Sequence, residues 1–179
     1  MDTLPDYLEP GLDLVFVGIN PGLYSAQYGH YFANLRNRFW AAFNLAEIAP
    51  VPFTPESDHA CLRYRIGFTD LVKRPTRGMA ELKPSEFALG AQVLRKKLLQ
   101  YRPLMVCFNG VTAYRNFAKH TDVPPSETSP GLKSSLIGAS RVWVLPSTSP
   151  ANAGVPLDRI IGGMRDLKRL LLKIKGIAP

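Results

Sequence analysis

Cysteine and histidine are scarce in this chain, which has two cysteines, Cys61 and Cys107, and three histidines. These residues lack the spacing of a structural zinc site, and an ordinary iron–sulfur cluster needs four thiolates. We therefore expect no metal and no other cofactor. So few cysteines are typical of a reducing compartment. Cys107 lies inside an apolar run and is predicted to be a small core residue.

Long apolar runs are also missing. The chain contains no stretch of 18 apolar residues and no basic-then-apolar leader, so we expect neither a membrane span nor a signal peptide, and no membrane partner. A short chain of this kind is expected to be a cytoplasmic, bacterial protein. The nucleotide-binding patterns GxxxxGK[ST] and GxGxxG are absent as well, which argues against a nucleotide-dependent enzyme.

Basic residues, in contrast, are abundant. The chain has 179 residues, enough for one domain spanning 1–179, and we expect a monomer. Its 22 lysines and arginines exceed its 14 acids and give a net charge of +8. This excess is typical of nucleic-acid binding, although acidic lipids or small phosphates would also suit it. Because the charge is spread along the chain, a DNA-binding surface would have to be assembled by the fold.

Three short apolar runs, at 14–19, 104–108 and 142–145, predict buried strands, and each is followed by a turn-forming sequence. Between and after them, apolar residues recur with helical spacing at 37–47, 85–101, 112–120 and 157–173. Ser85 is the expected N-cap of the second of these helices, Val93 is expected in its buried stripe, and 122–130 is expected to be a surface loop. Strands that alternate with helices predict a three-layer α/β sandwich, with a central, mostly parallel sheet flanked by helices.

The first strand ends abruptly in Asn20-Pro21-Gly22, which predicts a turn at its carboxyl end. Open α/β sheets place their ligand sites at this edge, where the loops after parallel strands converge. We therefore expect Asn20, Asn109 and Ser147 to meet in one site. An amide at that point can hold a water or a substrate carbonyl without carrying charge, although Asn20 could equally serve only the turn.

Several ordered blocks resemble one enzyme family. The blocks 18–23 (GINPGL), 37–40 (NRFW) and 145–149 (LPSTS), with further matches at 67–72, 74–76, 108–110 and 113–114, resemble the mismatch-specific uracil-DNA glycosylase and thymine-DNA glycosylase family. The resemblance implies a three-layer α/β domain that removes uracil from DNA, notably from G·U mismatches. The target nucleotide would be rotated out of the duplex, and hydrolysis of its N-glycosidic bond would leave an abasic site. No lyase lysine can be assigned, so we expect a monofunctional enzyme.

The resemblance also implies roles for individual residues. Asn20 would orient the attacking water, and the turn that carries Gly18, Ile19 and Gly22 would contact the base through its backbone. Phe32 falls where the family has an aromatic residue that stacks on the flipped base, although it could equally be a core residue. Asn109 could read a base edge through its paired donor and acceptor, or it could only form the Asn-Gly turn.

Asp70 departs from the family pattern. The residues around it, 67–72, match the family, yet its relatives carry lysine or asparagine at this position. An aspartate could act as general base for the water or stabilise the positively charged sugar, which Asn20 cannot do through charge. We therefore hypothesise that Asp70 shares catalysis with Asn20. The alternative is a structural carboxylate paired with Lys73 or Arg74.

The segment 146–152 is expected to enter the DNA where the flipped nucleotide leaves the stack. The predicted DNA-binding residues are Lys73, Arg74, Ser147, Thr148, Ser149, Pro150, Ala151 and Asn152. Since the tip of the segment carries only small residues, we expect weak discrimination of the opposite base, with uracil-containing double-stranded DNA as the main partner and single-stranded DNA also accepted. The alternatives are a damaged-DNA-binding module that does not cut, and a hydrolase of free nucleosides or nucleotides.

Overall fold

The computed structural model describes residues 3–123 and 128–177, which form a three-layer α/β sandwich around one five-stranded sheet. Its strand order is β2-β1-β3-β5-β4. The strands are β1 (Leu14–Gly18), β2 (Ile66–Asp70), β3 (Met105–Asn109), β4 (Gly131–Ile137) and β5 (Ser140–Leu145). Strands β2, β1, β3 and β5 are mutually parallel, while β4 pairs antiparallel with β5. The predicted fold class is confirmed.

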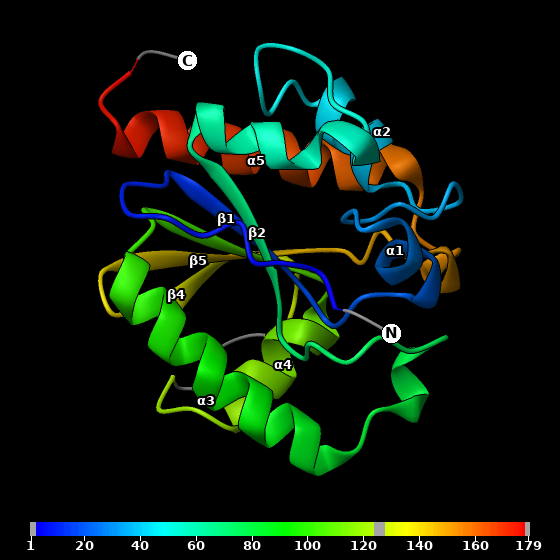
Figure 1. Cartoon of the computed structure of the whole chain (residues 1–179). Coiled ribbons are helices and arrows are strands. Elements are labelled where there is room, and N and C mark those ends of the chain that lie inside the picture. Colours follow the sequence, from blue (N-terminus) through cyan, green and yellow to red (C-terminus); the bar gives the residue numbers. More distant parts are fainter. Residues whose placement is uncertain (1–2, 124–127, 178–179) are drawn as a thin grey trace.

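Helices cover both faces of the sheet. In Figure 1, α2 and α5 lie on one face, and α3 and α4 lie on the other. The α-helices are α1 (Leu23–Tyr28), α2 (Phe39–Leu45), α3 (Pro84–Tyr101), α4 (Val111–Lys119) and α5 (Leu157–Ile174). Three 3-10 helices complete the described elements, η1 (Pro55–Tyr64), η2 (Met79–Glu81) and η3 (Pro150–Asn152).

The apolar runs form strands because both faces of the sheet are buried. Every residue of β1 is buried, and its side chains alternate between two separate cores. Leu14 and Phe16 pack in the core beneath α2 and α5, whereas Val15 and Val17 pack in the core beneath α3 and α4. The three inner strands β1, β3 and β5 are thereby fixed between two apolar layers.

The three predicted strands and the four predicted helical segments are all present, with ends that move by a few residues. Strands β2 and β4 were not predicted. The expected helix N-cap at Ser85 is wrong: α3 begins at Pro84, and the Glu86 carboxylate accepts a hydrogen bond of 2.9 Å from the backbone N–H of Lys83. Val93, expected in the buried stripe of α3, is 40% exposed. The surface loop predicted for 122–130 lies partly outside the described residues.

Candidate active site

A pocket of about 340 Å³ opens at the carboxyl ends of the parallel strands. Most of its wall comes from five segments: the turn after β1, the chain between α1 and α2, the end of β2 with the chain that follows, the end of β3, and the loop after β5. Asn20, Asn109 and Ser147 all lie in its wall, so the predicted convergence of these three residues is confirmed. A volume of this size is within the range of small-molecule sites.

The turn after β1 is held by the chain that follows β2. The Asn20 side-chain Nδ2 lies 2.8 Å from the backbone oxygen of Arg74, 2.8 Å from Thr76 Oγ1 and 3.2 Å from the backbone oxygen of Pro21. The Thr76 hydroxyl donates to the carbonyl of Gly78 at 3.0 Å, so it is free to accept from the amide. The amino end of Asn20 is therefore fully occupied. Its Oδ1 makes no hydrogen bond with a described residue, which leaves the pocket an uncharged acceptor.

Asp70, the last residue of β2, also lines the pocket and is almost fully buried. Its Oδ2 has no hydrogen-bond partner among the described residues. Its carboxylate lies over Gly18, where an added Cβ would collide with Oδ1. Burial raises the pKa of Asp70 to about 7, because Lys73 Nζ, 4.0 Å away, compensates the desolvation only in part and the charge of Asp6 adds to it.

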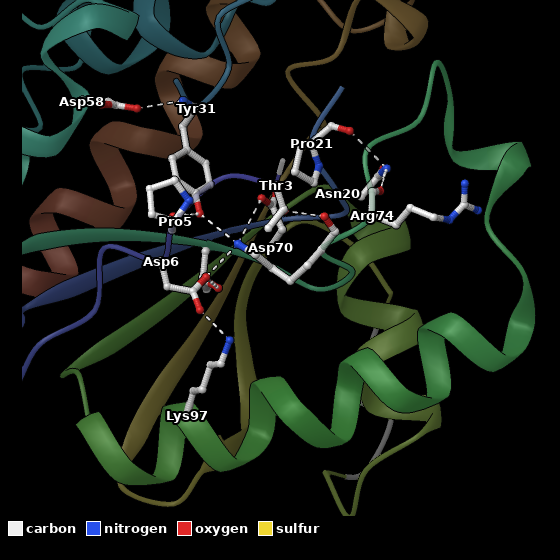
Figure 2. A network of polar contacts seen from close by, with 12 residues as sticks. Thr3, Pro5, Asp6, Asn20, Pro21, Tyr31, Asp58, Asp70, Arg74 and Lys97 are labelled. Atoms are coloured by element: carbon white, nitrogen blue, oxygen red, sulfur yellow. Dashed lines mark hydrogen bonds and ion pairs between the residues drawn. The ribbon is translucent and has the colours of Figure 1, made fainter. Parts of the chain in front are cut away.

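A network of ion pairs explains why Lys73 compensates Asp70 so weakly (Figure 2). Lys73 Nζ lies 2.8 Å from Asp6 Oδ1, and Lys97 Nζ contacts Asp6 Oδ2. The Thr69 hydroxyl donates to the same carboxylate at 2.7 Å. Burial opposes ionisation of Asp6, yet these partners together hold the pKa of Asp6 below its ordinary value. Lys73 is thus drawn to Asp6, and the Asp70 carboxyl is left with a pKa suited to proton transfer near neutral pH.

Phe32 lies in the pocket wall in an unusual backbone conformation. Its φ of 54° is rare for a bulky residue and costs on the order of 1–3 kcal/mol. One face of its ring stacks on Phe39, with centroids 4.0 Å apart and an interplanar angle of 19°. The ring is half-buried and belongs to both the core and the pocket, so the two interpretations of Phe32 are not exclusive.

Asn109 is tied to the loop after β5. Its Nδ2 donates to Thr148 Oγ1 at 2.8 Å, and its Oδ1 accepts from the Thr148 backbone N–H at 3.1 Å. The Thr148 hydroxyl donates in turn to Asn37 Oδ1 at 2.8 Å. The prediction that the Thr148 side chain binds DNA is wrong, because this side chain is completely buried and joins three segments. Asn109 retains one amide hydrogen and one lone pair for a ligand.

Arg38 fixes the rest of that loop, a role that was not foreseen. Its Nη2 donates to the backbone oxygens of Asn152 at 2.9 Å and Ser149 at 3.4 Å, and its Nη1 donates to the carbonyl of Val155. The sequence did contain a signal for this role, because Arg38 belongs to the block 37–40. The first two residues of that block, Asn37 and Arg38, both bind the loop after β5. Ser147, Ser149, Pro150 and Ala151 line the pocket, and Asn152 Nδ2 donates to the Ser147 carbonyl at 2.9 Å.

The two basic residues predicted to contact DNA each form an ion pair with an acidic residue of the same chain. Lys73 pairs with Asp6, as described. Arg74 donates from Nε and Nη2 to the two carboxylate oxygens of Glu86, at 2.6 and 2.9 Å. Its side chain points away from Asn20 (Figure 2). Both cations are thus held in ion pairs within the chain, and contact of either with DNA stays a prediction. The pocket wall contains instead Arg36 and Arg77, which are exposed and form no ion pair with any residue that the structure describes.

Both cysteines are buried and unpaired, and burial raises the pKa of the Cys61 thiol to about 12. Within residues 3–123 and 128–177, no three His, Cys, Asp or Glu side chains are grouped so that they could hold a metal ion. Over the same residues, no helix has both the length and the apolar content to cross a membrane.

Comparisons with known proteins identify the fold and the family of the chain. The structure superposes on the solution NMR structure of a candidate uracil DNA glycosylase from Methanosarcina acetivorans with a TM-score of 0.62 and 21% identity, covering 95% of this chain and 97% of that one. This similarity establishes the shared fold. The sequence model of the Uracil DNA glycosylase superfamily matches residues 5–159, most of the chain. The chain therefore belongs to the uracil DNA glycosylase superfamily.

Proposed function

We propose that this protein hydrolyses the N-glycosidic bond of uracil in DNA, which releases the free base and leaves an abasic site. One observation carries the proposal. The acceptor oxygen of Asn20, the buried carboxyl of Asp70 and the ring of Phe32 line the same pocket at the carboxyl edge of the sheet. Superfamily membership supplies the substrate class.

The target base has to leave the duplex before it can enter the pocket, at a cost of roughly a few kcal/mol. Phe32 offers the free face of its ring for stacking on the base, since Phe39 supports the other face. The remaining amide hydrogen and lone pair of Asn109 suit the edge of a pyrimidine that carries both donor and acceptor groups. The backbone around Ile19 and Gly22 completes the base contacts.

Cleavage of the bond between C1′ and N1 leaves positive charge on the sugar and negative charge on the departing base. The Asn20 oxygen accepts a hydrogen bond from a water and turns the water's lone pair toward C1′. As the oxygen of that water bonds to C1′, the electrons of the C1′–N1 bond leave with the base. The ionised Asp70 carboxylate stabilises the positive sugar and takes the water's proton. A pKa near 7 allows Asp70 to be ionised and still accept a proton at neutral pH.

Discrimination of the opposite base follows from the loop after β5. Its tip carries Ala151, Asn152 and Ala153, none of them bulky. We expect the enzyme to release uracil opposite guanine, opposite adenine and in single strands. The rates on these three substrates should not differ by several orders of magnitude. Uracil paired with guanine should be somewhat faster, because the wobble pair is easier to open.

The test is uracil release from matched oligonucleotides that carry U opposite G, U opposite A, or U in a single strand, detected as alkali-labile breaks. Asn20→Ala removes the acceptor oxygen and should lower the single-turnover rate by about 10²-fold or more. Asn116→Ala, on α4 and outside the pocket, is the matched control. Salt-sensitive DNA binding without release of any base would refute the proposal and support the non-cutting alternative. Release from free nucleosides alone would support the metabolite hydrolase.

A further inference from the structure

Phe32 keeps its unusual backbone conformation because both of its neighbours in the chain are fixed. The backbone N–H of Tyr31, the residue before it, donates to Asp58 Oδ2 at 2.8 Å (Figure 2). The backbone N–H of Ala33, the residue after it, donates to Ser25 Oγ at 3.0 Å. A bulky residue at a φ of 54° persists only where its surroundings over-determine the backbone. These two hydrogen bonds, one on each side of Phe32, supply that constraint.

Both acceptors are buried and belong to other elements than Phe32. Ser25 lies on α1, and Asp58 lies on η1 and is completely buried. The second oxygen of Asp58, Oδ1, accepts from the backbone N–H of His59 at 2.6 Å and from the Tyr7 hydroxyl at 3.2 Å. It also lies 3.3 Å from His30 Nδ1. A buried carboxylate needs such partners, and together they prevent Asp58 from turning away from the segment that it holds.

The backbone conformation of Phe32 decides where its ring lies. One face of the ring rests on Phe39, and an edge of the ring borders the space over Gly18 that the Asp70 carboxylate occupies. The direction of a Cα–Cβ bond depends on φ and ψ, so relaxation of Phe32 to a negative φ would move the ring away from both neighbours. Asp58 is not part of the pocket wall, so its effect on a substrate has to pass through this segment.

We propose that Asp58 and Ser25 are positioning residues of the base pocket. They hold Phe32 in the left-handed conformation, with the free face of its ring already oriented to stack on the flipped base. This inference rests on the proposed function. A ring that is fixed before the base arrives need not be ordered during binding, so more of the stacking energy is available to keep the base out of the duplex. Ser25 also lines the pocket, whereas Asp58 acts only from behind it.

The experiment is a double-mutant cycle on single-turnover uracil release from duplex DNA, with Phe32→Ala as the second substitution. In the wild-type background, Asp58→Ala should slow release by about ten- to one-hundred-fold, as expected when a strained residue is free to relax. Asp58→Asn retains an oxygen for the Tyr31 N–H and should lose less. In the Phe32→Ala background, Asp58→Ala should cause little further loss, because the ring that it positions is gone. Equal losses in the two backgrounds would overturn the proposal.

Asp13→Ala is the matched control for the loss of a buried carboxylate. Asp13 is 4% exposed, lies 3.2 Å from Arg65 Nε and directly precedes β1, at the edge of the sheet opposite the pocket. At a temperature where circular dichroism shows each variant to be folded, Asp13→Ala should release uracil at the wild-type rate. A loss as large as that of Asp58→Ala would show that destabilisation alone slows release, which would also overturn the proposal.

Ser25→Ala tests the other side of Phe32 and removes only one hydroxyl, so it serves in the same cycle if Asp58→Ala does not fold. The loss of one neutral hydrogen bond should slow release by about two- to tenfold in the wild-type background. This loss should disappear in the Phe32→Ala background. An undiminished loss there would show that Ser25 acts on the substrate directly and does not position Phe32.

A second readout does not depend on cleavage. Duplex DNA that carries 2′-fluoro-2′-deoxyuridine retains its uracil, because the fluorine disfavours positive charge on the sugar. The wild-type protein and Asp13→Ala should bind this duplex more tightly than the same duplex with 2′-fluoro-2′-deoxycytidine, and Asp58→Ala and Phe32→Ala should lose most of this preference. If the wild-type protein releases no uracil but the four proteins show this pattern, the proposed function fails and the positioning role stands. If uracil is released and Asp58→Ala keeps the full preference, the positioning role fails and the function stands.

Discussion

Asp70→Asn should gain stability relative to the wild-type protein as the pH rises to neutral, while it slows catalysis. In the folded chain, Asp70 keeps its proton up to a pH of about 7, whereas the ordinary pKa of the group is 3.8. Between these two values the folded state binds more protons than the unfolded state, so the stability of the wild-type protein falls as the pH rises. Above about pH 7, Asp70 is ionised in both states and its contribution to stability no longer changes with pH.

The size of the effect follows from the two pKa values. A difference of about 3 in pKa corresponds to about 4 kcal/mol. Because asparagine does not ionise, the free energy of unfolding of Asp70→Asn minus that of the wild-type protein should increase by up to this amount between pH 4 and pH 8. Comparing the two proteins across pH cancels the constant cost of placing an amide where Oδ2 has no partner.

Urea denaturation at a series of pH values measures this difference. Asp158→Asn, the same substitution at an exposed carboxylate of α5, is the matched control. Single-turnover uracil release supplies the second half of the test. The wild-type rate should rise with pH and level off above about 7, and Asp70→Asn should lack this rise and be slower by about 10²- to 10⁴-fold.

The two measurements refute different steps. A stability difference that is the same at pH 4 and pH 8 would show that Asp70 is not a buried, poorly compensated acid. A pH-dependent stability difference together with an unchanged rate would show that Asp70 is such an acid but takes no part in catalysis.

Three further changes test the surroundings of this carboxyl. Asp6→Asn should release Lys73 toward Asp70, lower the pKa of Asp70 and move the midpoint of the pH–rate profile below that of the wild-type protein. Gly18→Ala should destabilise the protein by about 1–3 kcal/mol, measured by urea denaturation, and slow uracil release, because its methyl group collides with the carboxylate. Arg38→Ala removes a charged donor from three carbonyls of the loop after β5, so it should cost about 1.5–3 kcal/mol of stability and weaken DNA binding.

Local sequence patterns were sufficient to predict much of the fold and the centre of the site. The strands β1, β3 and β5 are continuous apolar runs that end at turn-forming residues, and both features are local. The parallel arrangement then brings their carboxyl ends together, so the meeting of Asn20, Asn109 and Ser147 could be deduced before the structure was known.

What could not be predicted depends on contacts between distant parts of the chain. Strand β2 has Gly67, Thr69 and Asp70 among its five residues and looks polar until its burial beside β1 is known. The fate of Lys73 depends on Asp6, which lies 67 residues away along the chain. Basic residues next to a motif suggested DNA contacts, yet the structure uses Lys73 and Arg74 in internal ion pairs and leaves other arginines free.

The features of this pocket that lower stability are the ones that the proposed hydrolysis requires. Phe32 has a strained backbone, and its ring can therefore face the pocket while Phe39 supports it from behind. Asp70 is buried without full compensation, and its pKa is therefore near neutral. Gly18 has no Cβ atom, and the Asp70 carboxylate occupies the space that a Cβ atom would fill. Each of these three features lowers the stability of the folded chain and at the same time positions a group for the substrate. The two apolar cores of the sheet supply the stability that allows all three features to persist.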